Sequence, residues 1–224
     1  MKMKRSEKLG MFTGLVVGVL LLLISVFMIF QTTCKVWGAE KPANATQQGI
    51  DVSSHQGKID WEQVKNSALA DYAIIRCGYG VNQTDKDDKY WDYNSSECER
   101  LGIPYGTYLY SGADTTAKAK SEAEHVVRLL QGKNLTYPIY YDMEADMLNQ
   151  LSSTQIGNIA KTFLNTMESY GYKNVAVYSN KYLFETKLTA TVFSDYPKWI
   201  AQHSNKCTYP VSYTHLRAHE TGAY

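Results

Sequence analysis

The chain has 224 residues, and its 23 lysines and arginines nearly balance 22 aspartates and glutamates, for a formal net charge of +1. This balance gives no electrostatic case for a nucleic-acid partner. The sequence has no Cys/His cluster at zinc spacing, no P-loop and no G-x-G-x-x-G after a strand, so we expect no metal and no cofactor. With 44% hydrophobic residues, it can build one sizeable core.

The N-terminus has the pattern of an export signal. Residues 1–8 are basic, and residues 9–30 then run without a charge. As a helix this run would reach roughly 33 Å, enough to span a bilayer core, with the basic segment on the cytoplasmic side. A signal peptide usually has a shorter apolar region of about 7–15 residues. We therefore predict an exported protein, either membrane-anchored with an extracellular domain or secreted if the signal is cleaved near residues 36–38.

Residues 31–48 are polar and predict a linker. After it, short apolar runs alternate with amphipathic ones. We predict strands at 49–53, 72–76, 104–111, 137–144, 175–178 and 198–201. We predict helices at 61–68, 90–101, 115–131, 152–171 and 182–187.

Local signals support the helix boundaries. Asp60 stands where an N-cap is needed, and Ser152-x-x-Gln155 has the pattern of a capping box. Gly102 and Gly132 follow the second and third predicted helices as C-terminal stops. These signals indicate separate helices between the strands.

The alternation of strands and helices favours an α/β fold of βα units with a parallel sheet, closed or nearly closed into a barrel. The stretch from residue 49 onward is short for a full eight-fold barrel of about 250 residues. In such folds the chemistry lies at the carboxyl ends of the strands. Five candidate side chains fall there: Asp51, Tyr110, Asp142, Glu144 and Tyr178.

The fourth predicted strand ends in two carboxylates, Asp142 and Glu144. Alternate side chains of a strand share a face, so both acids and Tyr140 point the same way. Like charges that close raise each other's proton affinity, which can keep one carboxyl protonated beside an ionised one, as glycosidic bond cleavage requires. The alternative is a strand that runs out into a loop with two solvated acids. The 18 tyrosines suit sugar binding, although tyrosine also fills β-rich cores.

Several segments together resemble the family-25 glycoside hydrolases, the Chalaropsis-type lysozymes. The matching segments, in order, are Gly49-Ile50-Asp51-Val52-Ser53-Ser54-His55-Gln56-Gly57, Ile59-Asp60-Trp61, Ile74-Ile75-Arg76, Gly102-Ile103-Pro104-Tyr105-Gly106-x-Tyr108, Asp142-x-Glu144 and Trp199-Ile200-Ala201-Gln202. The resemblance implies an irregular, TIM-like (β/α) barrel. It also implies cleavage of the β-1,4 bond between N-acetylmuramic acid and N-acetylglucosamine in peptidoglycan, whose glycan strands would be the binding partner. We expect the enzyme to be a monomer.

The resemblance also implies roles for individual residues. Glu144 matches the general acid/base, Asp142 its strand neighbour, and Asp51 the carboxylate on the first strand. The expected substrate-binding residues are Tyr110, Tyr178, Tyr140, Trp199, His55 and Gln202. For His55, a solvated loop position is the alternative to a role at the substrate or beside Asp51.

Three routes of hydrolysis stay open. A retaining enzyme with its own nucleophile needs carboxyls about 5–5.5 Å apart, and an inverting enzyme about 6.5–9.5 Å. The substrate's 2-acetamido group could also attack the anomeric carbon, with Asp142 orienting it, and we favour this route by analogy. Two other functions remain as alternatives: a wall-glycan-binding module that has lost catalysis, and a chitin-cleaving enzyme.

Two further features concern the cysteines and the end of the chain. Cys77 and Cys98 could pair outside the cell or could be free buried thiols. Residues 211–224 resemble the translation of a sequencing adapter, so we predict a hydrolase domain at 49–210 that lacks its last strands, followed by an artefactual tail. An open barrel would leave unpaired strand edges.

Overall fold

The computed structural model of the chain describes residues 46–68, 70–202, 209 and 215–216. The predicted basic segment at 1–8, the predicted membrane helix at 9–30 and most of the predicted linker and tail lie outside these residues. Within the described part, none of the helices combines the length and the apolar character that crossing a membrane requires.

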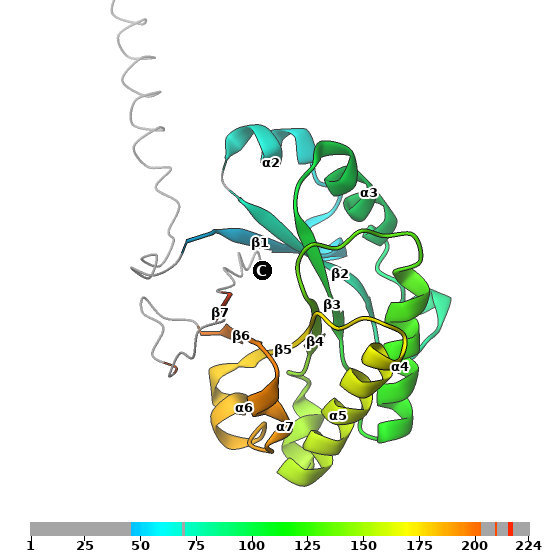
Figure 1. The fold of residues 1–224 in the computed structure, drawn as a ribbon, viewed down its shortest axis with the longest axis vertical. Helices are drawn as coiled ribbons and strands as arrows, with labels where there is room; N and C mark the ends of the chain where they lie inside the picture. Colours follow the sequence, from blue (N-terminus) through cyan, green and yellow to red (C-terminus); the bar gives the residue numbers. More distant parts are fainter. Residues whose placement is uncertain (1–45, 69, 203–208, 210–214, 217–224) are drawn as a thin grey trace, which may run out of the picture. The chain divides into compact units, whose positions relative to one another are not determined.

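A parallel sheet forms the centre of the described unit, and its strands follow one another in chain order (Figure 1). The strands are β1 (Gly49–Val52), β2 (Tyr72–Tyr79), β3 (Tyr105–Tyr110), β4 (Ile139–Asp142), β5 (Val175–Asn180), β6 (Lys198–Ala201) and β7 (His215–Leu216). Every neighbouring pair is parallel. The predicted parallel βα sheet is therefore confirmed. In the described residues the sheet is open, with β1 and β7 at its edges.

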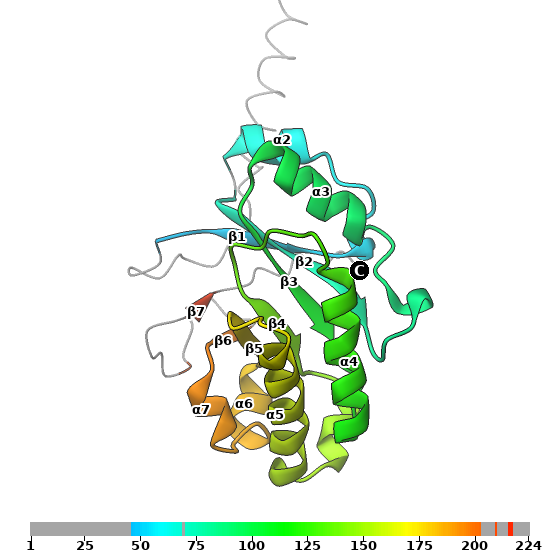
Figure 2. The ribbon, with the colours of Figure 1, turned by 45° about the vertical axis from the view of Figure 1, so that its right-hand side comes forward.

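Helices connect successive strands. They are α2 (Trp61–Ser67), α3 (Trp91–Leu101), α4 (Thr116–Leu129), α5 (Ser153–Ser169), α6 (Lys181–Thr186) and α7 (Val192–Asp195), with short 3-10 turns η1 (Ser54–Gln56), η2 (Thr84–Lys86) and η3 (Asp146–Gln150). Figures 1 and 2 show α4 and α5 packed side by side on the outside of the curved sheet. This layering leaves the inner face of the sheet to line the site.

The predicted helix boundary signals are present. The Asp60 carboxylate accepts a hydrogen bond from the Gln63 amide at 3.0 Å, and Ser152 and Gln155 form the reciprocal capping box. Gly102 ends α3 with φ +62°, a left-handed conformation that favours glycine.

The two faces of β4 belong to different clusters, as its alternation predicts. Ile139, Tyr141 and Met143 pack into the large core between the sheet and the helices. Tyr140 faces the other way. The buried residues of this inner cluster are Tyr72, Ile74, Tyr140, Ala176, Tyr178, Trp199 and Ala201. The inner face is therefore rich in aromatic side chains.

Most strand boundaries differ from the prediction by one to three residues, and two of these differences concern the site. β4 ends at Asp142 and not at Glu144, because β3 ends beside it and the Asp142 carbonyl accepts from the Ser111 amide just beyond that strand. β2 continues to Tyr79, three residues past its predicted end, with a register irregularity between Arg76 and Gly78. Neither α7 nor the two-residue β7, which pairs with β6, was predicted.

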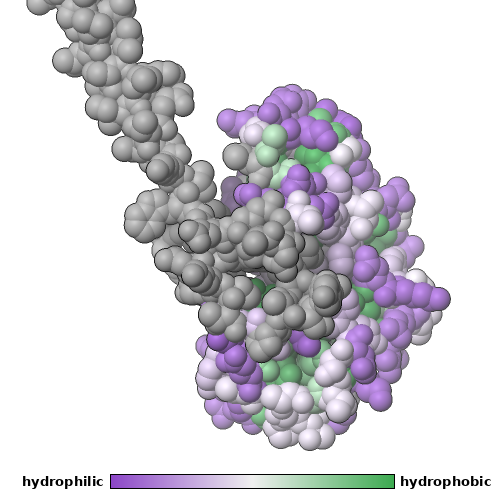
Figure 3. All heavy atoms as spheres, turned by 60° about the vertical axis from the view of Figure 1, so that its left-hand side comes forward, coloured by the Kyte–Doolittle hydropathy of each residue, from purple (hydrophilic) through white to green (hydrophobic). Residues whose placement is uncertain are grey.

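Cys77 and Cys98 are buried free thiols, so the structure favours that alternative over a disulfide. The surface in Figure 3 is mainly hydrophilic, with hydrophobic residues in small groups. The large hydrophobic side chains that are exposed in the described residues are three separate tyrosines, Tyr79, Tyr170 and Tyr182.

Candidate active site

A pocket of about 200 Å³ opens at the carboxyl ends of the strands. Its lining residues are Asp51, His55, Arg76, Tyr108, Tyr110, Asp142, Glu144, Tyr178 and Trp199. Strand register explains why many of these side chains meet in one pocket. Successive cross-strand partners on β3 to β6 are Tyr110, Asp142, Tyr178 and Trp199. One row across the sheet thus carries an acid and three aromatic rings.

The two predicted acids stand on backbone that is fixed on both sides. The Asp142 carbonyl accepts from Ser111 N at 2.9 Å, and Met143 N donates to the Tyr178 carbonyl at 2.9 Å. The Met143 carbonyl accepts from Ser179 Oγ at 2.6 Å. These bonds hold the residue between the acids against β5, so both carboxyls have a rigid support. Asp142 is buried, whereas Glu144 is half-buried.

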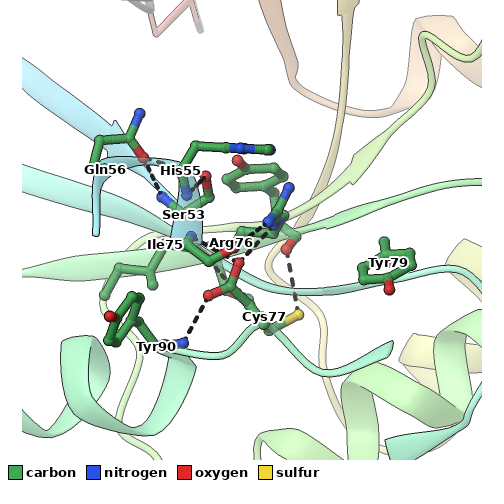
Figure 4. Close-up of polar contacts among 12 residues, drawn as sticks. Ser53, His55, Gln56, Ile75, Arg76, Cys77, Tyr79 and Tyr90 are labelled. Atoms are coloured by element: carbon green, nitrogen blue, oxygen red, sulfur yellow. Dashed lines mark hydrogen bonds and ion pairs between the residues drawn. The ribbon is translucent and has the colours of Figure 1, made fainter. Parts of the chain in front are cut away.

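Asp51 enters the pocket from β1, and a capped turn follows it. Ser53 and Gln56 form a capping box around η1, in which Ser53 N donates to Gln56 Oε1 at 2.8 Å (Figure 4). This turn places His55 at the rim, where its side chain is exposed although it lines the pocket. The site thus has a third carboxylate and an imidazole beside the acid pair.

Trp199 is the centre of the aromatic wall. Its ring makes edge contacts with Tyr178 at 4.6 Å, Tyr140 at 5.1 Å and Tyr108 at 6.2 Å between centroids. Its indole N–H is buried and has no hydrogen-bond partner among the described residues. A buried donor without a partner is costly, so a ligand oxygen at this position would be favourable.

The acids influence the phenols around them. Burial is the main reason why the pKa of Tyr110 is raised, and the neighbouring Asp142 and Glu144 charges raise it further. Burial likewise raises the pKa of Tyr108 above its ordinary range, followed by the charge of Asp142. Both phenols therefore stay protonated at neutral pH and can donate hydrogen bonds to a ligand or to the acids.

The structure brings most of the predicted site residues together. Asp51, Asp142, Glu144, Tyr110, Tyr178, Trp199 and His55 all line the pocket. Tyr140 is not among the lining residues, because it is buried and packs against Trp199. Gln202 follows β6, is half-buried and is also outside the lining set.

Sequence reasoning did not single out Arg76 and Tyr108, although both stand in the matched segments. Their signal was alternation. Arg76 follows the inner-face residues Tyr72 and Ile74 at a spacing of two, and Tyr108 lies two residues before Tyr110 at the end of β3. In the described residues, no group of three or more His, Cys, Asp or Glu side chains could hold a metal ion.

The family model described as glycosyl hydrolases family 25 matches residues 50–220. The chain belongs to this family. An autolytic lysozyme of Clostridium acetobutylicum is 28% identical to this family-25 chain over 177 residues, covering 79% of it and 51% of the relative. The chain thus spans about half the length of that relative.

Solved structures have the same fold as this chain. The modular autolysin LytC of Streptococcus pneumoniae superposes with a TM-score of 0.68 at 34% identity, covering 75% of this chain and 40% of LytC. A family-25 hydrolase of Bacillus anthracis has the same fold, with a TM-score of 0.64 at 20% identity over 74% of this chain and 75% of that one.

Proposed function

We propose that this chain is a peptidoglycan hydrolase, a lysozyme that cleaves the β-1,4 bond between N-acetylmuramic acid and N-acetylglucosamine. The observation that carries the proposal is the pair Asp142 and Glu144, held at a strand end inside an aromatic pocket. Membership of family 25 and the likeness to an autolytic lysozyme support the substrate class. LytC, which shares the fold, has been solved with a synthetic peptidoglycan ligand.

In this proposal Glu144 is the general acid/base. It is half-buried and lines the pocket, so its proton can reach a leaving oxygen, whereas Asp142 is buried and suits a fixed, orienting role. We propose that the substrate's 2-acetamido oxygen attacks the anomeric carbon while Asp142 orients the acetamido N–H, and that Asp51 completes the acid set from β1. Trapping a covalent sugar–Asp142 adduct in a mass spectrum would overturn this route.

Trp199, Tyr110 and Tyr178 would bind the sugar at this centre, with His55 at the rim. A pocket of about 200 Å³ is smaller than the roughly 300–1,000 Å³ that enclose a whole drug-sized ligand. It therefore fits part of an extended glycan strand that continues over the surface. We propose that Tyr140 acts from beneath by supporting Trp199.

The proposal extends to the barrel architecture and to the location of the protein in the cell. We infer that the parallel sheet is part of an irregular barrel and that residues 9–30 anchor an exported monomer to the membrane, because they are uncharged and long enough to span it. Recovery of the full chain in washed membranes is the expected result. A trimmed form in the culture medium would contradict the anchor.

The function is tested by incubating the full chain with purified peptidoglycan and assaying new reducing ends. The proposal expects them with peptidoglycan and expects none when chitin oligosaccharides replace it. Binding to peptidoglycan by a folded chain, without new reducing ends, would identify a glycan-binding module instead.

A further inference from the structure

Arg76 of β2 is the arginine that lines the pocket with the three acids, and its side chain is only 15% exposed. We propose that Arg76, held by the buried carboxylate of Asp88, is a positioning residue that sets the pH range of catalysis by stabilising the ionised pocket acids. This inference rests on the proposed hydrolase function, but it concerns a charge pair that the acid/base chemistry does not itself use.

Asp88 binds three separate parts of the chain. Its side chain is fully buried and accepts from Arg76 Nε at 2.8 Å, from Ser54 N at 2.9 Å and from Tyr90 N at 2.9 Å. Arg76 Nη2 also donates to Ser54 Oγ at 2.8 Å (Figure 4). The guanidinium is thus fixed between β2 and the turn that follows Asp51, and it cannot swing out into solvent without breaking this network.

Arg76 has more acidic residues on its pocket side than on its opposite side. In the pocket it shares the lining with Asp51, Asp142 and Glu144, with His55 at the rim and with the phenols of Tyr108, Tyr110 and Tyr178. From the α3 side it meets Asp88. The preceding residue, Asp87, pairs instead with His125 Nε2 at 2.8 Å and with Arg128.

Tyr108 lies close enough to the pocket acids and to Arg76 to feel both kinds of charge. Burial raises its pKa most, the charges of Asp142 and Asp51 raise it further, and Arg76 lowers it. One phenol thus lies within reach of both acids and of the guanidinium. A fixed cation in the same pocket lowers the pKa of the carboxyls beside it. Arg76 therefore lets the pocket acids ionise although they are crowded together.

Removing the two charges must act in opposite directions. Without the Arg76 cation, the pKa of the pocket carboxyls rises, so both limbs of the pH–activity profile move to higher pH. Without the Asp88 anion, the Arg76 charge is less neutralised, so both limbs move to lower pH. A purely structural pair would lower activity at every pH in both variants and leave the limbs in place.

The experiment measures kcat/KM on peptidoglycan from pH 4 to 9 for the full chain and for Arg76→Met, Arg76→Lys and Asp88→Asn. We expect a rise of about 0.5–1 pH unit for Arg76→Met, a fall for Asp88→Asn and a profile close to wild type for Arg76→Lys. Arg100→Met is the control, because Arg100 pairs with Glu97 and Glu62 on the exposed surface and should shift nothing. If Arg76→Met does not fold, the near-isosteric Asp88→Asn decides the direction alone.

Unmoved limbs, or shifts of equal sign in Arg76→Met and Asp88→Asn, would overturn the proposal. NMR titration of the Asp and Glu side-chain carbons in the same proteins gives a readout that needs no activity. Absence of cleavage by the wild type would refute the hydrolase function, while the titration would still show whether Arg76 controls the pocket carboxyls.

Discussion

A buried acid outside the pocket holds the carboxyl ends of β3 and β4 together, and its removal should be costly. Glu122 of α4 is fully buried and accepts from Gly112 N at 2.8 Å, Ser111 Oγ at 2.9 Å and Tyr141 OH at 2.6 Å. Glu122→Ala removes the acceptor of all three donors, and only the Ser111 and Tyr141 hydroxyls, 2.8 Å apart, keep a partner in each other. At about 1–3 kcal/mol for each unsatisfied buried group, and with water entering the space, we expect a loss of about 3–5 kcal/mol in the free energy of unfolding. That is a large share of a typical 5–15 kcal/mol.

The assay is denaturant unfolding of the full chain in mild detergent, followed by tryptophan fluorescence, because Trp61, Trp91 and Trp199 are buried. The matched control is Glu124→Ala on the same helix, whose contact with Lys120 at 3.9 Å is largely exposed and should cost less than about 0.5 kcal/mol. A loss below about 1 kcal/mol in Glu122→Ala would refute the role of Glu122.

Three further predictions concern the charge of Glu122, the two buried cysteines and the start of α5. Burial raises the pKa of Glu122 above its ordinary value of 4.5, so the stability that its protonated form contributes should be complete below pH 4.5 and be lost as pH rises through the folded-state pKa. The free energies of unfolding of wild type and Glu122→Gln should therefore differ increasingly as pH rises, and a parallel pH dependence would contradict this. Burial raises the pKa of both Cys77 and Cys98 to about 12, so maleimide labelling with peptide mapping should find these two thiols protected in the native protein and reactive after unfolding. Labelling of either thiol in the native protein would contradict this. Ser152→Ala removes the N-cap of α5 and should cost about 1 kcal/mol in the same unfolding assay, which an unchanged midpoint would contradict.

The fold was largely predictable because its signals are local. Alternation on β4, the Asp60 cap and the Ser152 capping box each depend on residues within one turn or one strand, and each is present. Strand ends were less predictable, because a strand ends where its neighbours end. β4 stops at Asp142, level with Tyr110 at the end of β3, which only the register reveals.

The pocket acids could be predicted because they terminate apolar strands, where a charge is conspicuous. Asp88 could not, because its partners Ser54 and Arg76 lie 34 and 12 residues away in the chain. Glu122 was missed for a related reason. Its helix was interpreted from its apolar stripe, and a buried carboxylate is indistinguishable in sequence from a solvated one until its donors are known.

The most direct test of the central claim is mass spectrometry of the products that the full chain releases from purified peptidoglycan, with Glu144→Gln and Asp146→Asn in parallel. Asp146 is exposed, two residues from Glu144 and outside the pocket lining, so it controls for the loss of one nearby charge. The account predicts fragments ending in reducing N-acetylmuramic acid for the wild type and for Asp146→Asn, and none for Glu144→Gln. Fragments ending in reducing N-acetylglucosamine, or equal products from Glu144→Gln, would contradict it.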